Sequence, residues 1–225
     1  LRGTGFCNVN QLFDVNTEQA QRLEVLRGPG TTSHGANALH GVINVISMPP
    51  TQTPAGSLDL ELGPYDYGRA KFSYSYLNGA NFAGRISFNV AHDGGYQDDS
   101  VYDQQKVSFR NDYNGDTWRI ESLLSLSNLD QDTAGYIEGK DAFEDDDIAT
   151  TNPFPEAYRE NLTARFYARF MRELGSNGLL QLTPYLRYID GEFLQHFLPG
   201  QPLEENWQQG LGLQSGFYQQ ASDVL

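Results

Sequence analysis

The chain of 225 residues carries 29 acidic and 15 basic side chains, and its formal net charge of -14 argues against nucleic acid or an anionic membrane surface as a partner. A single cysteine excludes a disulfide framework and a cysteine-based zinc site within the chain. Because no run of about 18 apolar residues occurs, a membrane-spanning helix is excluded, whereas 23 glycines and 12% aromatic residues suit a strand-rich protein.

The first 50 residues mix short helical and strand patterns. A short helix is predicted at 18–22, and two short apolar segments, 23–26 and 42–47, are predicted to be strands. The connection between these strands holds residues that give a sharp stop, a positive φ angle or a close backbone approach: Gly28, Pro29, Gly35 and Gly41.

A proline-rich stretch at 49–54 separates this first part from a second part that alternates apolar and polar residues with a period of two. Phe72, Tyr74 and Tyr76, for example, alternate with serines and a lysine, so that aromatic rings face one side of the strand. About eight strands are predicted, at 56–63, 67–78, 82–92, 104–114, 116–128, 159–174, 178–193 and 207–219.

Such alternation is typical of a soluble antiparallel sandwich as well as of a membrane barrel. Loop lengths favour the barrel, because tight turns that contain glycine alternate along the chain with long connections at 93–103, 128–158 and 190–206. One short early loop at 64–67 is the exception to this alternation. In an outer-membrane barrel one rim has short turns and the other has long loops. Aromatic residues at predicted strand ends suit the girdles of such a barrel: Tyr113, Trp118 and Trp207.

The order of residues in 22–47 resembles the plug domain of the TonB-dependent outer-membrane receptors. The late plug pattern of that family runs through Val-Leu-Arg-Gly-Pro, a Ser/Thr turn, a Tyr-Gly, small residues and Gly-Val-Ile-Asn, which ends at Asn44 here. His34 stands where the family often has Tyr, and His40 where it often has a second Gly. The framework of the pattern is otherwise present.

The resemblance implies a mainly β fold. Residues 1–50 are then the C-terminal part of an α+β plug domain, and 51–225 are the N-terminal portion of a transmembrane antiparallel β-barrel, with about eight of a presumed 22 strands. The chain begins at Leu1 without a signal-peptide pattern, so we interpret it as a fragment of a longer protein.

A small barrel closed by about eight strands is the rival architecture. Its interior would be filled by side chains and would leave no room for a plug, so the first part would have to lie outside. The arginines predicted to face inward favour a wide, wet lumen or a polar plug surface instead: Arg85, Arg110, Arg119, Arg165, Arg169 and Arg187.

The resemblance also implies a function in the bacterial outer membrane, embedded in its lipid. Receptors of this family take up a scarce large solute, such as a ferric siderophore or another iron chelate, with energy from the TonB complex of the inner membrane. A non-transporting outer-membrane surface receptor, an adhesin or an occupancy sensor is the alternative. We expect no enzymatic activity and no cofactor, because the sequence has neither a nucleophile elbow nor a phosphate-binding loop.

Arg27 is the plug residue with a specific expected role. By resemblance it corresponds to an arginine that pairs with barrel-wall carboxylates and latches the plug to the wall, because a charge buried at that interface has to be paired. The expected partners lie on later strands, beyond Leu225. The alternative is a solvated arginine at a strand end.

The acidic connection 128–158 opens with a partial match to a calcium-binding loop. The candidate ligands, at its first, third, ninth and twelfth positions, are Asp130, Asp132, Glu138 and Asp141. Ala134 occupies the fifth position and an aspartate replaces the usual glutamate at the twelfth, so a solvated extracellular loop is the preferred interpretation. The four histidines lack further ligands at metal-binding spacing: His34, His40, His92 and His196.

Overall fold

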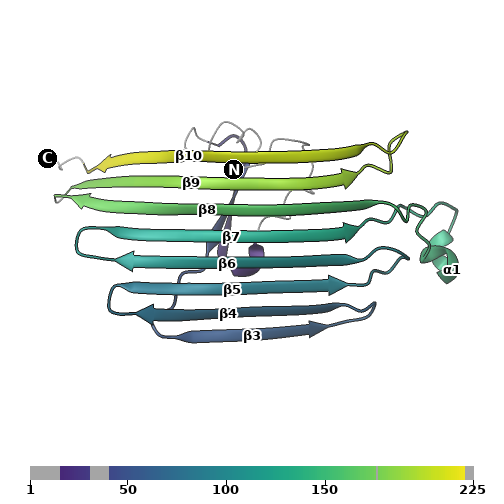
Figure 1. Cartoon of the computed structure of the whole chain (residues 1–225), viewed down its shortest axis with the longest axis horizontal. Helices are drawn as coiled ribbons and strands as arrows, with labels where there is room; N and C mark the ends of the chain where they lie inside the picture. Colours follow the sequence, from purple (N-terminus) through teal and green to yellow (C-terminus); the bar gives the residue numbers. More distant parts are fainter. Residues whose placement is uncertain (1–15, 31–40, 176, 221–225) are drawn as a thin grey trace.

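The computed structural model describes residues 16–30, 41–175 and 177–220, which form two antiparallel sheets. The larger, here called the wall, has eight strands in the order β10-β9-β8-β7-β6-β5-β4-β3 (Figure 1). The smaller, here called the first sheet, pairs β1 (Ala20–Arg27) with β2 (Gly41–Ser47) and lies on one face of the wall. Among the described residues, no helix has both the length and the apolar character needed to cross a membrane.

The wall confirms all eight predicted strands. They are β3 (Ala55–Leu62), β4 (Gly68–Asn78), β5 (Phe82–Asp93), β6 (Tyr102–Asn114), β7 (Arg119–Asp132), β8 (Tyr158–Leu174), β9 (Gly178–Leu194) and β10 (Leu203–Gln219). Each is hydrogen-bonded to its neighbours along the chain, and β3 and β10 form the two open edges. The rival barrel of eight strands closed on itself is therefore wrong, and the wall is an open, partial barrel.

The loop lengths follow the predicted parity. Short turns join β4 to β5, β6 to β7 and β8 to β9 at one end of the wall, which lies on the left in Figure 1. The long connections lie at the other end, where the loop between β7 and β8 contains η4 (Ala142–Glu144) and α1 (Asp146–Ala149). Gly79, with a φ of 74°, makes the first short turn, because an L side chain rarely adopts that backbone region.

Two local predictions are wrong. The helix expected at 18–22 is the single 3₁₀ turn η2 (Thr17–Gln19), because Ala20 already pairs with Ser47 in the first sheet. Trp207 lies inside β10 instead of at a strand end, because β9 and β10 remain paired as far as Leu194 and Leu203. Tertiary pairing extends a strand past the point where its alternation can be recognised in sequence.

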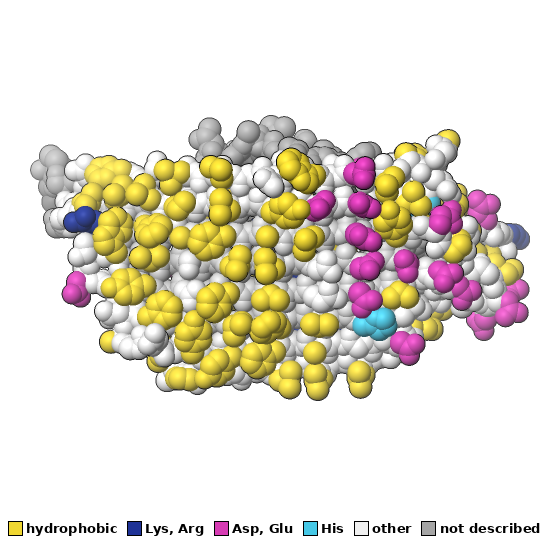
Figure 2. Space-filling view, in the orientation of Figure 1, with side chains coloured by type: hydrophobic (Ala, Val, Ile, Leu, Met, Phe, Trp, Pro, Cys, Tyr) yellow, Lys and Arg dark blue, Asp and Glu magenta, His cyan; other side chains and the backbone are white. Residues whose placement is uncertain are grey.

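The wall buries polar side chains and exposes apolar ones. Its buried side chains are mostly polar and lie on the face that carries the first sheet: Ser73, Ser75, Ser87, Asn89, Gln104, Lys106, Ser108, Ser127, Thr163 and Thr183. The opposite face, here called the outer face, exposes large apolar residues such as Leu186 (56%) and Leu211 (83%). Figure 2 shows hydrophobic side chains spread over much of that face. A soluble sandwich would bury them, so the sandwich alternative is also wrong.

The register places outer-face residues of neighbouring strands directly opposite one another. The middle row is apolar across six strands: Ile86, Phe109, Leu124, Phe166, Leu186 and Leu211. Toward the long loops a second row, here called the acid row, crosses the same strands: His92, Asp103, Asp130, Glu160, Glu192 and Glu205. It lies within the zone where Figure 2 shows acidic side chains gathered in a column.

The spacing of these rows matches a membrane. From Phe82 to His92, at about 3.3 Å per residue, the outer face of β5 spans ~33 Å. A tilt of roughly 40° reduces this to ~25 Å along the membrane normal, the height of the apolar band of outer-membrane barrels. The acid row therefore lies at the edge of the band, on the long-loop side.

Candidate functional site

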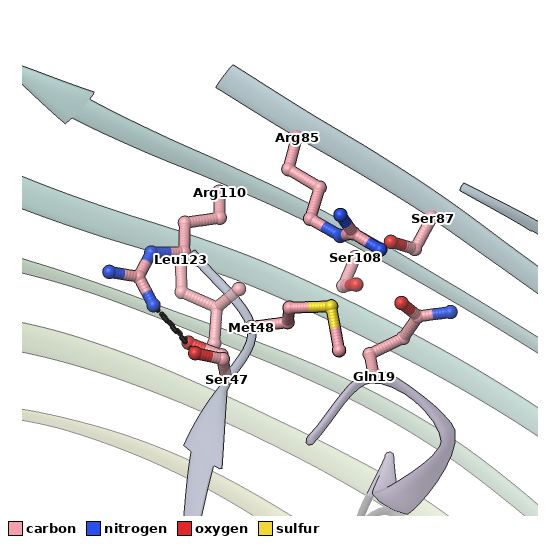
Figure 3. Close-up of a pocket in the computed structure, with 8 residues that line it drawn as sticks. All are labelled: Gln19, Ser47, Met48, Arg85, Ser87, Ser108, Arg110 and Leu123. Atoms are coloured by element: carbon pink, nitrogen blue, oxygen red, sulfur yellow. Dashed lines mark hydrogen bonds between the residues drawn. The ribbon is translucent and has the colours of Figure 1, made fainter. Parts of the chain in front are cut away.

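The first sheet contacts the wall through the end from which the connection to β3 leaves, here called its linker end. In the register of the first sheet, Ala20 lies opposite Ser47 at this end, and Arg27 lies opposite Gly41 at the other. Arg110 on β6 donates to the Ser47 carbonyl oxygen at 2.7 Å and to its hydroxyl at 3.0 Å (Figure 3). One wall arginine thus holds the end of β2.

Two wall cations hold Glu18, which lies two residues before the start of β1. Glu18, in η2, places Oε1 2.9 Å from Arg69 Nη2 on β4, and Oε2 3.6 Å from Lys106 Nζ on β6. The three side chains are 18%, 22% and 6% exposed, respectively. Charges that are this far removed from water require partners, so these ion pairs are a specific contact between the first sheet and the wall.

A small pocket lies in the contact between the linker end of the first sheet and the wall, here called the seam. Its lining comes from η2, β2, the linker after β2 and three wall strands: Gln19, Ser47, Met48, Arg85, Ser87, Ser108, Arg110 and Leu123 (Figure 3). Its volume of about 10 Å³ suits a single water molecule. Arg85 beside it donates to the hydroxyls of Ser73 and Ser75 at 2.8 and 3.3 Å. The seam is therefore a polar contact surface, and its pocket is too small to hold a large cargo.

Arg27 lies at the far end of the first sheet, where it is exposed to solvent. No ion pair joins it to another of the residues that the structure describes. The described residues therefore do not test the latch at this end, which stays a prediction.

The motif residues that surround Arg27 shape the first sheet. Gly28 has a φ of 94°, and a Cβ on Gly41 would lie 2.8 Å from the Leu26 carbonyl oxygen, so both positions require glycine. Asn44 donates to Glu24 across the two strands at 2.9 Å. Hydrogen bonds from Arg22 and then from Asn44 hold the pKa of the Glu24 carboxyl below its usual range. Pro29 directly follows Gly28, whereas Gly35, His34 and His40 lie outside the described residues.

The four calcium candidates are divided between a strand and a loop. Asp130 and Asp132 are outer-face residues of β7, and Asp130 belongs to the acid row. Glu138 and Asp141 follow in the loop that leads to η4. Among the described residues, no three His, Cys, Asp or Glu side chains are grouped in a way that could hold a metal ion. The spacing that suggested a calcium loop therefore begins in a paired strand.

Calcium titration tests these candidates directly. We expect isothermal titration of the purified protein with Ca²⁺ to give no saturable heat, because two of the four carboxylates are held in a β-ladder. The double variant Asp130→Asn, Asp132→Asn is the matched control and should give the same trace. Saturable heat in the wild type that this variant loses would establish a calcium site.

The long connections contact one another beyond the acid row. Gln97 Nε2 donates to the carbonyl oxygens of Gly135 at 3.2 Å and Thr151 at 2.9 Å, and so joins the β5–β6 loop to the β7–β8 loop. The backbone N–H of Asp98 donates to Thr150 O at 2.7 Å, which strengthens the same contact. These two loops form one unit at the long-loop end of the wall.

The β9–β10 loop joins this unit. The His196 ring lies 4.8 Å from the Phe154 ring, and Gln201 Nε2 donates to Glu156 at 2.8 Å. A backbone N–H and the Gln201 amide hold the pKa of the Glu156 carboxyl below its usual range. His92, by contrast, contacts Asp103 in the acid row at 2.9 Å. Both described histidines thus have local partners.

Sequence reasoning missed the seam. The sequence predicts Glu18 only as part of a short helix, and its partners Arg69 and Lys106 are 51 and 88 residues away, beyond the reach of any spacing argument. The available signal was indirect. The six inward arginines named from the alternation do lie on the face that carries the first sheet, and a basic face of that kind requires acidic partners.

Comparison with known proteins gives short sequence matches. The chain is 39% identical to the pesticin receptor of Yersinia pestis over 67 residues, which are 28% of this chain and 10% of that protein. It is 43% identical to the ferric enterobactin receptor PirA of Pseudomonas aeruginosa over 44 residues, which are 20% of this chain and 6% of that one. No protein-family model matches the sequence.

The fold matches over nearly the whole chain. The siderophore receptor PiuA of Acinetobacter baumannii superposes with a TM-score of 0.74 over 95% of this chain and 33% of its own, at 13% identity. This chain thus spans about a third of that structure and about a tenth of the pesticin receptor. The matched sequence, the shared partial barrel and the apolar outer face together show that this chain is similar to part of the outer-membrane receptors described by these names.

Proposed function

We propose that the protein takes up an iron chelate of the siderophore class across the outer membrane, with energy supplied by the TonB complex. In this proposal residues 1–50 belong to the plug, and 51–225 form the first part of the barrel wall. One observation carries it: the first sheet is held by buried charges against the polar face of a wall whose other face is apolar. That arrangement supports a polar lumen occluded by a plug, with lipid on the outer side of the wall.

The physical problem of uptake supports the need for energy. A pore wide enough for an iron chelate would leak small solutes, so a plug has to occlude it. Movement of the plug requires work, which has to come from the inner membrane because the outer membrane has neither ATP nor a maintained ion gradient. The names of PirA and PiuA, which specify ferric enterobactin and siderophores, support an iron chelate as cargo.

An uptake assay tests this function. Cells that express the full-length receptor are expected to accumulate radioactive iron supplied as a catecholate siderophore, and to lose accumulation when TonB is deleted. Cells without the receptor are the control for other routes. Binding of the chelate at the cell surface without accumulation would instead favour a non-transporting surface receptor or an occupancy sensor. The proposal assigns no enzymatic reaction to the chain.

A further inference from the structure

We propose that Glu18 is a positioning residue that fixes the linker end of the first sheet to the wall strands β4 and β6. The proposal builds on the plug-and-wall arrangement above. It assigns this role to a carboxylate in η2, the turn that leads into β1, and to cations in the wall, at the opposite end of the first sheet from Arg27.

The geometry gives Glu18 a set of partners that an incidental surface contact would not have. Arg69 does not depend on Glu18 alone, because its Nε donates to Asn89 Oδ1 at 3.0 Å and its Nη1 lies 3.8 Å from Glu61. The guanidinium is thus oriented in advance by two neighbouring strands. Lys106, 6% exposed, is the most deeply buried member. An arriving carboxylate therefore meets an arginine that is already oriented and a lysine that is largely removed from water.

Neighbouring bonds make the linker end a single unit. The backbone N–H of Met48 donates to the Gln19 carbonyl at 2.9 Å, so the residue after β2 is bonded to the residue after Glu18. Arg110, which holds Ser47, is itself held by two hydrogen bonds to Asp112 at 2.8 and 2.9 Å. Glu18 and Ser47 therefore hold adjacent points of the first sheet.

This arrangement makes the linker end the fixed end of the first sheet. Arg27, at the other end of β1, is exposed, and its expected partners lie on other strands. If the Arg27 contact is released, the first sheet remains attached through Glu18 and Ser47. Glu18 thus sets how far this part of the plug moves while it stays bound to β4 and β6.

Hydrogen exchange in the full-length receptor tests the proposal. Glu18→Gln keeps the shape of the side chain and removes its charge. It should raise amide exchange in residues 17–22 and 45–48 by about tenfold or more, because Lys106 then loses a buried counter-charge. Influx of a large hydrophilic antibiotic into cells should rise as well. Equal exchange in Glu18→Gln and in the wild type would overturn the proposal.

Glu24→Gln is the matched control, because Glu24 is a carboxylate of the adjoining strand β1 that pairs with Arg22 and not with the wall. It should change exchange at the linker end by less than about twofold, since an exposed pair contributes little. An effect as large as that of Glu18→Gln would contradict the proposal. If Glu18→Gln does not reach the membrane, Glu18→Asp, compared with Glu24→Asp, replaces it with the same expected difference.

A double-mutant cycle separates pairing from general loosening. Glu18→Gln combined with Arg69→Gln should raise exchange no more than the larger single effect, whereas additive effects would show that the two residues act independently. Neither readout involves cargo. A receptor that fails to accumulate iron but shows the predicted exchange would refute the proposed function and leave the role of Glu18 intact.

Discussion

Arginine in place of Leu124 is expected to destabilise the folded barrel in its membrane by about 2–4 kcal/mol, because it puts a charge at the middle of the lipid-facing band. Leu124 lies on the outer face of β7, in the middle row, and is 37% exposed within this chain. Folding of the full-length receptor into lipid vesicles as a function of urea concentration measures the loss. The amount of receptor in the outer membrane should fall in parallel.

Asn128→Arg is the matched control, because Asn128 is an outer-face residue of the same strand two positions from Asp130 in the acid row. At this depth an arginine is expected to cost roughly 0–1 kcal/mol, since the side chain reaches the interface. A similar loss of stability in both variants would show that the band has been placed at the wrong depth. A negligible loss in Leu124→Arg would show that the outer face does not meet lipid.

This depth dependence explains why acidic residues lie in one row. Like charges directly opposite each other in a sheet destabilise it, and Asp130, Glu160 and Glu192 are neighbours in the register. Their position at the interface keeps them in contact with water, where such repulsion is weak. A carboxylate in the middle row would have no such contact. The row thus marks where lipid ends on the long-loop side.

The strands could be predicted because alternation with a period of two is a local property. The choice of buried face was not available from alternation, since a sandwich and a barrel share it, and the loop parity decided between them. The ends of the strands are harder to predict from sequence. Asp130 and Asp132 look like loop residues by composition, yet pairing with β6 and β8 holds them in β7. Their acidic character reflects depth in the membrane.

The candidate site can be predicted only in part from the sequence, because some of its contacts are local and others join distant segments. The residues of the plug motif lie within one segment, and Gly28 and Gly41 have backbone requirements that a sequence can indicate. Glu18 meets Arg69 and Lys106 only because the first sheet is placed on the wall. Contacts of this kind depend on the tertiary arrangement, and no local pattern encodes them.

Arg27→Ala in the full-length receptor is expected to loosen the plug and to raise passive leakage of small hydrophilic solutes. By resemblance, Arg27 is expected to pair with carboxylates of the barrel wall, and removal of one partner of a buried ion pair costs about 3–5 kcal/mol. Single-channel conductance in planar bilayers and the uptake of a chromogenic antibiotic by intact cells both report leakage. Because Glu18 still holds the linker end, we expect partial opening and not complete loss of the plug.

Arg22→Ala supplies the control on the same strand. Arg22 is an exposed arginine of β1 that pairs with Glu24 at 2.8 Å, and both side chains are about half exposed. An exposed pair of this kind contributes little to stability, so its loss should leave leakage at the wild-type level. Equal leakage in Arg22→Ala and Arg27→Ala would show that Arg27 is a solvated strand-end residue. The combination of Arg27→Ala with Glu18→Gln releases both ends of the first sheet, and it should therefore leak more than either single variant.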